Sequence, residues 1–296
     1  MVNRPNWATQ QERGSVWTIR LIVWLALRLG RRAMRVLLLP ICLYFMLVPS
    51  HWQQASRDYL PRVLGRRTRF SDGWRHCHGF ASCLLDRVYL LNNQTGRFAI
   101  TVHGAALITE LRAKGQGSLL FGAHLGSFEV CRAAGRAMMD LPISLLMYED
   151  NARKTGAVLN AVNPDLGMEI IALGRPGSIL AVRDRLEQGH LVGVLADRGL
   201  TEERRVQLPF LGAPAWFPEG PFRMAGLLGQ PVLLMFGIYR GGNRYDIVFE
   251  ALPDPQDLAE SMRHYVRRLE YYCHDAPYNW FNFGNCPGGS AQLRQS

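Results

Sequence analysis

The chain has 296 residues, of which 48% are hydrophobic, and a net charge of +10. This length and composition allow a sizeable core, which excludes an intrinsically disordered protein. The six cysteines follow no disulfide-framework spacing, so a small disulfide-stapled secreted fold is excluded and reduced thiols in a cytosolic setting are expected.

The excess positive charge lies entirely in residues 1–70. They carry twelve arginines, no lysine and only two acidic residues, Glu12 and Asp58. A basic segment can face nucleic acid or an anionic membrane surface. Long apolar runs accompany these arginines, so the pattern favours a membrane surface and no nucleic-acid partner.

Residues 1–60 are predicted to form basic, hydrophobic helices that associate with a membrane. Residues 16–29 and 36–48 are apolar runs of 14 and 13 residues, shorter than the roughly 20 residues of a transmembrane helix. Four of the seven tryptophans lie in this region, as is typical of a bilayer interface. We expect two helices in one leaflet, with a helical hairpin buried on the domain and a tilted span over residues 19–48 as alternatives.

Residues 56–91 are predicted to be helical. They contain His76, Cys77, His78 and Cys83, but this spacing fits no common structural zinc site. We therefore expect no metal and no other cofactor.

From about residue 98 the pattern alternates between helices and strands. Helices are expected at residues 105–114, 128–139, 152–162, 178–188 and 255–274, and strands at residues 118–122, 143–148, 168–173, 190–195, 231–239 and 245–252. The alternation predicts an α/β fold, in which a mostly parallel mixed sheet is covered by helices on both faces. We assign residues 61–288 to one domain with this α/β fold and residues 289–296 to a disordered tail.

Polar side chains gather just beyond the predicted strand Ser118–Gly122. The following loop and helix start bring His124, Ser127 and Glu129 together. A histidine titrates near neutral pH and can act as a general base, and a carboxylate beside it can fix its tautomer and stabilise the imidazolium. We predict that His124 is the base, that Glu129 orients it and that Ser127 caps the helix.

A second polar cluster follows the strand predicted at residues 190–195. Asp197 and Arg198 come directly after it, so both clusters are expected to open on the crevice beyond the strand ends. We predict that Ser127, Asp197 and Arg198 contact substrate there, because the Arg198 guanidinium suits a substrate phosphate. Arg204 and Arg205 lie in the same loop, either binding phosphate or pairing with Glu202 and Glu203 at the surface.

Five stretches resemble a known family. They are GAHLGSFEV around His124, ADRG at residues 196–199, FPEGPFRMA at 217–225, GQPV at 229–232 and NWFNF at 279–283. In this order they are similar to the late acyltransferases of lipid A biosynthesis, within the lysophospholipid acyltransferase superfamily. The resemblance implies that Glu219, Gly220 and Arg223 contact the acceptor, although Pro221 stands where a hydroxyl residue is common. The aromatic side chains of residues 279–283 are expected to complete the core.

The resemblance implies an acyltransferase. It would move a fatty acyl chain from an acyl carrier protein or coenzyme A thioester to a hydroxyl or amine of a lipid or glycolipid. Its expected location is the bacterial inner membrane, with the catalytic domain on the cytoplasmic face. Two alternatives remain: a lipid hydrolase that uses the same histidine and glutamate on water, and a non-catalytic lipid-binding membrane protein.

Overall fold

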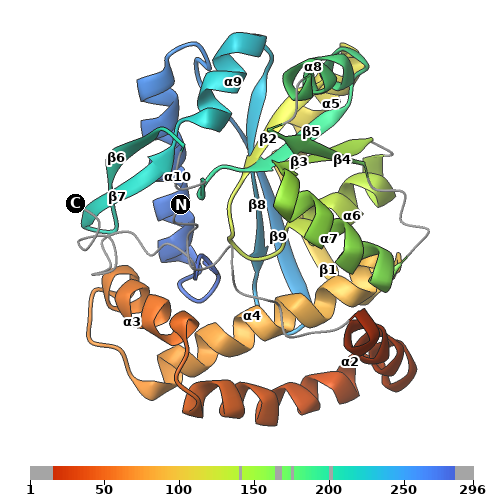
Figure 1. Cartoon of the computed structure of the whole chain (residues 1–296), viewed down its shortest axis with the longest axis vertical. Helices are drawn as coiled ribbons and strands as arrows, with labels where there is room; N and C mark the ends of the chain where they lie inside the picture. Colours follow the sequence, from red (N-terminus) through yellow and green to blue (C-terminus); the bar gives the residue numbers. More distant parts are fainter. Residues whose placement is uncertain (1–15, 140–141, 164–168, 175–176, 200–202, 284–296) are drawn as a thin grey trace, which may run out of the picture.

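The computed structural model describes residues 16–139, 142–163, 169–174, 177–199 and 203–283. The first 15 residues of the predicted membrane-associating region and the predicted tail at 289–296 lie outside these ranges. The described part is a layered α/β structure with helices on both faces of a central sheet (Figure 1).

The central sheet has seven strands in the order β1-β9-β8-β2-β5-β3-β4. Their bounds are β1 Ala99–His103, β2 Ser118–Gly122, β3 Ile143–Tyr148, β4 Ile170–Leu173, β5 Leu191–Leu195, β8 Val232–Tyr239 and β9 Arg244–Ala251. Strands β8, β2, β5, β3 and β4 run parallel. Strand β9 is antiparallel to β8, because the short connection between them can form a hairpin but not a crossover. The predicted mostly parallel mixed sheet is confirmed.

Helices cover the sheet on both faces. They are α4 Phe70–Leu91, α5 Ala105–Ala113, α6 Phe128–Met139, α7 Glu149–Val162, α8 Ser178–Glu187, α9 Gly220–Leu228 and α10 Leu258–Asp275. Strand β2 is buried along its whole length, and its side chains alternate between two cores. Phe121 belongs to the core that includes α9 and α10, whereas Leu120 belongs to the core that includes α4 and α6.

Two helices precede the sheet, α2 (Val16–Leu47) and α3 (His51–Leu64). Helix α2 is interrupted at Gly30, where φ is 79° and ψ is 163°. It packs against α4 with a stripe of buried residues, namely Val23, Ala26, Met34, Leu38 and Cys42. Arg31 pairs with the buried carboxylate of Asp86 at 2.7 Å and so ties α2 to the domain.

The opposite face of α2 is apolar and exposed. Trp17 is 78% exposed, Tyr44 60% and Leu47 69%. By length and composition, no helix in the described ranges could cross a membrane alone, whereas α2 and α3 together, bent by 90°, meet these criteria. Helix α2 therefore has features of two predicted arrangements. One face is buried on the domain, as in the hairpin alternative, and the other is exposed and apolar, as expected for a helix that lies in one leaflet.

The structure corrects two expectations for secondary structure. The helical region predicted over residues 56–91 is confirmed as two helices, since Gly65 ends α3 in the left-handed conformation with φ at 62° and α4 begins at Phe70. Strand β1 was missed; it is a short edge strand that is largely exposed. The hairpin of β6 (Arg205–Phe210) and β7 (Ala213–Pro218) was also missed, since prolines in both strands obscure a strand pattern.

His76, on α4, is buried and forms hydrogen bonds to α3 and to the C-terminal segment. Its Nδ1 lies 2.9 Å from the Ser56 hydroxyl, and its Nε2 lies 2.9 Å from the carbonyl oxygen of Trp280. Because the carbonyl only accepts, Nε2–H donates to it and Nδ1 accepts from Ser56. Burial lowers the pKa of His76 to about 4, although the hydrogen bond to Trp280 opposes this shift.

This pKa predicts a loss of stability in mild acid. The unfolded chain binds a proton at His76 near its ordinary pKa of about 6.5, whereas the folded chain binds it only near pH 4. The contribution of neutral His76 to the free energy of unfolding is therefore complete above pH 6.5. This free energy should fall by about 3 kcal/mol as the pH drops toward 4. Urea unfolding across this range should show the decline, and His76→Phe should flatten the slope. An unchanged slope in His76→Phe would refute the assignment.

Candidate active site

The loop between β2 and α6 is fixed by two close backbone contacts. Gly126 N–H donates to the Asn279 carbonyl at 2.8 Å, and Ser127 N–H donates to the Gly237 carbonyl at 2.7 Å. Gly126 has a φ of 66°, and a Cβ there would lie 1.9 Å from the Gly237 oxygen. Only glycine fits this position, so the turn that presents His124 is held against β8.

His124 and Asp197 meet because of the register of two neighbouring strands. In the parallel pair β2–β5, Gly122 lies opposite Leu195. His124 and Asp197 each follow two residues later. His124 Nδ1 lies 2.8 Å from Asp197 Oδ1, and the His124 backbone N–H donates to Oδ2 at 3.1 Å. The two predicted polar clusters therefore form one site.

The Asp197 carboxylate is buried and ionised. Burial alone would raise its pKa, but the charge that His124 carries when protonated, the hydrogen bonds of His124 and the charge of Arg198 hold the pKa below its ordinary value. The indole N–H of Trp280 donates to Oδ2 at 3.1 Å. The ionised carboxylate can only accept, so the proton of the neutral imidazole lies on Nδ1 and Nε2 is the basic nitrogen.

Glu129, predicted to orient His124, has other partners. Its carboxylate lies 2.8 Å from Arg87 Nε on α4, and it accepts a hydrogen bond from Ser127 Oγ at 3.3 Å. The first-turn helical position was predicted correctly, since Glu129 is the second residue of α6. The carboxylate at Nδ1 is instead that of Asp197, because the register of β2 and β5 brings it to this nitrogen.

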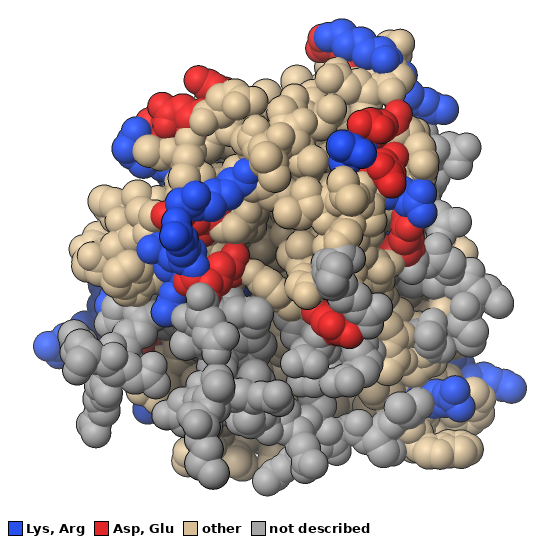
Figure 2. Space-filling model, turned by 45° about the horizontal axis from the view of Figure 1, so that its top comes forward, with Lys and Arg blue, Asp and Glu red and all other residues tan. Residues whose placement is uncertain are grey.

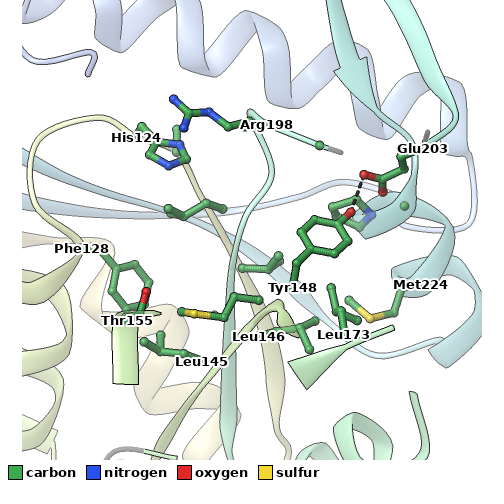
Figure 3. A pocket seen from close by; sticks show the side chains of 18 of the residues that line it. His124, Phe128, Leu145, Leu146, Tyr148, Thr155, Leu173, Arg198, Glu203 and Met224 are labelled. Carbon is green, nitrogen blue, oxygen red and sulfur yellow. Dashed lines mark hydrogen bonds between the residues drawn. The ribbon is translucent and has the colours of Figure 1, made fainter. Parts of the chain in front are cut away.

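A cavity of about 730 Å³ lies beside His124. It is lined mainly by apolar side chains from β3, β4, β5, α6 and α9, among them Phe128, Leu145, Leu146, Leu173, Val194 and Met224. Figure 3 shows His124 and Arg198 at one side of the cavity and the Tyr148–Glu203 hydrogen bond at the other. Since Nδ1 is turned to Asp197, Nε2 is the imidazole nitrogen available to a molecule in the cavity.

Arg198 brings a cation to the same cavity. Its Nη2 and Nε donate to Oδ1 of Asn282, at 2.6 and 3.0 Å. Burial lowers the pKa of Arg198, and the charge of Asp197 partly offsets this effect. Because an arginine remains protonated even when its pKa falls moderately, the site contains a positive charge.

The predicted acceptor residues differ in position. Gly220 lines the cavity, whereas Glu219 and Arg223 form an ion pair one helical turn apart and are not among the described lining residues. A Cβ on Gly220 would lie 2.0 Å from Glu203 Oε1, so this glycine makes room for the Glu203 carboxylate. Pro221 also lines the cavity.

Five site residues were not predicted: Arg87, Tyr148, Glu203, Trp280 and Asn282. Glu203 was interpreted as a surface charge, and Trp280 and Asn282 as part of a core-forming segment. A signal was present for the last two, because residues 279–283 were among the stretches that resembled the family. Their polar partners lie more than 80 residues away, however, and only the fold reveals them.

The comparison with protein families agrees with these features. A model of the bacterial lipid A biosynthesis acyltransferases matches residues 77–285, which is more than half of the chain. No curated protein matched significantly. The family predicted from the five motifs is confirmed, and the match includes the His124 loop, Asp197 and Trp280. The chain belongs to the bacterial lipid A biosynthesis acyltransferase family and is therefore an acyltransferase.

Proposed function

We propose that this enzyme transfers a fatty acyl chain from a thioester of acyl carrier protein or coenzyme A to a hydroxyl or amine of a lipid A-like lipid or glycolipid, with His124 as general base. The observation that supports this most is the 2.8 Å contact of His124 Nδ1 with buried Asp197 at the edge of a largely apolar cavity. A base with a fixed tautomer beside an apolar cavity suits a long-chain acyl substrate.

The reaction proceeds through a ternary complex. Nε2 of His124 takes the proton of the acceptor group as that group attacks the thioester carbonyl. The tetrahedral intermediate then expels the thiolate, which receives the same proton and leaves as a thiol. An acyl-enzyme is disfavoured, because no serine or cysteine is found among the described residues that line the cavity. Ser127 is buried and directs its hydroxyl to Glu129.

Arg198 is our candidate partner for the developing negative charge. The sequence left open whether backbone N–H groups of residues 122–127 or an arginine would stabilise the oxyanion. The N–H groups of His124, Gly126 and Ser127 already donate to protein acceptors. The Arg198 guanidinium, which lines the cavity, is therefore favoured for the oxyanion or for a substrate phosphate.

Glu129 retains a place in the proposal. It lines the same cavity as His124 and fixes Arg87, which also lines it. We assign the orientation of His124 to Asp197. Glu129 instead holds Arg87 in place at the cavity wall. Arg204 is exposed and has no assigned role.

We further propose that α2 lies on the cytoplasmic face of the bacterial inner membrane. Its exposed apolar face and its arginines suit the boundary between acyl chains and anionic head groups. Trp17→Glu/Tyr44→Glu is expected to weaken binding to phosphatidylethanolamine–phosphatidylglycerol vesicles about tenfold in a flotation assay. The matched control is Leu227→Glu, which changes an equally exposed residue on α9, at the opposite end of Figure 1. Equal losses in both variants would contradict the proposed membrane face.

The proposed acyl donor is a thioester of either acyl carrier protein or coenzyme A. The face shown in Figure 2 carries basic and acidic side chains interspersed, so its charge does not favour an acidic carrier protein. The transfer proposal is tested by measuring thioester consumption with each donor while the acceptor lipid is varied. Consumption should rise with acceptor concentration and saturate. A rate that is independent of acceptor would instead support the hydrolase alternative, and binding without turnover the non-catalytic one.

A further inference from the structure

Residues 279–283 lie against the loop that carries His124, and Phe281 lines the cavity. Two backbone contacts attach them to the loop that carries His124. The Asn279 carbonyl accepts the Gly126 N–H at 2.8 Å, and the Phe281 N–H donates to the His124 carbonyl at 2.7 Å. The segment thus holds the backbone on both sides of Leu125.

Trp280 reaches the carboxylate behind His124. Its indole N–H donates at 3.1 Å to Asp197 Oδ2, the oxygen that also accepts the His124 backbone N–H. With two donors on Oδ2, the carboxylate is held so that Oδ1 meets His124 Nδ1. The Trp280 side chain is buried against Phe210 at 5.3 Å between ring centroids, which keeps the indole in place.

Asn282 holds the Arg198 guanidinium in a similar way. Its Oδ1 accepts from two nitrogens of Arg198, and its Nδ2 donates to the Asp197 carbonyl at 3.4 Å. Asn282 itself is buried, at 3% exposure. The guanidinium is therefore fixed by a side chain from the same segment that holds the carboxylate.

We propose that Trp280 and Asn282 are positioning residues for acyl transfer, with Trp280 acting on His124 through Asp197 and Asn282 acting on Arg198. This inference rests on the proposed function of His124 as general base. If Trp280 loses its N–H, one donor to the Asp197 carboxylate disappears. The carboxylate charge is then less neutralised and attracts the imidazolium more strongly, while the geometry of the hydrogen bond at Nδ1 is less well fixed.

The decisive variant is Trp280→Phe, which keeps an aromatic ring and removes only the donor. In the full-chain protein we expect kcat for transfer to fall about tenfold, with KM for the donor nearly unchanged. The acidic limb of the kcat/KM profile should move upward by about half a pH unit. Asn282→Ala releases Arg198 and should leave the acidic limb in place. It should raise KM for the thioester donor if Arg198 binds a substrate phosphate, and lower kcat if Arg198 meets the oxyanion.

Phe210→Leu is the matched control, because it disturbs the packing around Trp280 without removing a polar contact. It should lower the melting temperature and leave the acidic limb where it is. A wild-type kcat and acidic limb in Trp280→Phe would overturn the proposal, as would an equal shift of the limb in Phe210→Leu.

A titration that does not depend on activity separates this inference from the proposed function. Histidine NMR signals of the detergent-purified protein can be followed with pH, and the His124 signal is the one missing in His124→Ala. Positioning by Trp280 predicts an upward shift of this titration in Trp280→Phe even if no acyl donor or acceptor is turned over. An unshifted titration would reject the positioning role, whatever the reaction proves to be.

Discussion

Replacing His124 by alanine is expected to lower kcat of acyl transfer by about 10²- to 10⁴-fold, the range for loss of a general base. Binding of the thioester should change little, because the cavity is formed mainly by apolar side chains and the arginine remains. The residual rate should come from orientation of the two substrates in the cavity. Initial rates with saturating donor and acceptor measure the effect.

His103→Ala is a suitable control for this variant. His103 is an exposed histidine at the end of the edge strand β1 and is not among the described lining residues of the cavity. It should keep the wild-type rate and melting temperature. If His124→Ala retains more than about a tenth of the wild-type kcat, a general-base role is excluded.

Replacing Asp197 by asparagine should be nearly as damaging, with kcat reduced by about 10²- to 10⁴-fold. The amide has almost the same shape but no negative charge to stabilise the imidazolium. It can also present its NH₂ group to Nδ1, which places the imidazole proton on Nε2 and removes the base. Higher pH should not restore the rate, because the defect lies in the tautomer.

Glu129→Gln is the comparison that separates the two carboxylates. We expect a loss of roughly tenfold or less, since this change weakens the contact with Arg87 and leaves the His124–Asp197 hydrogen bond intact. Circular dichroism should verify that both variants fold. A large loss in Glu129→Gln with a small loss in Asp197→Asn would restore Glu129 as the partner of His124.

The central strands and their mostly parallel arrangement could be predicted from the sequence, because these strands are buried on both faces. Strand β2 reads as a short apolar run, and β8 is buried at every residue, so the pattern is unambiguous. Both polar clusters were placed correctly beyond strand ends. The edge strand β1 and the proline-containing hairpin β6–β7 lack such a pattern, since exposure and hairpin packing decide their conformation.

The partner of His124 could not be chosen from the sequence alone. Glu129 is five residues away, whereas Asp197 is 73 residues away, so local spacing favoured Glu129 although the fold brings Asp197 to Nδ1. The missing information was that β5 is the neighbour of β2 in register, with Gly122 beside Leu195. Trp280 escaped prediction for the same reason, because its hydrogen bond to Asp197 depends on the return of the chain after α10.

The most direct test of the account is mass spectrometry of membrane lipid after incubation with purified enzyme and acyl carrier protein or coenzyme A that bears an isotope-labelled acyl chain. We expect a lipid whose mass increases by one labelled acyl group, formed by the wild type and by His103→Ala but almost absent with His124→Ala. Label recovered only as free fatty acid, or lipid acylated equally by the His124→Ala protein, would contradict it.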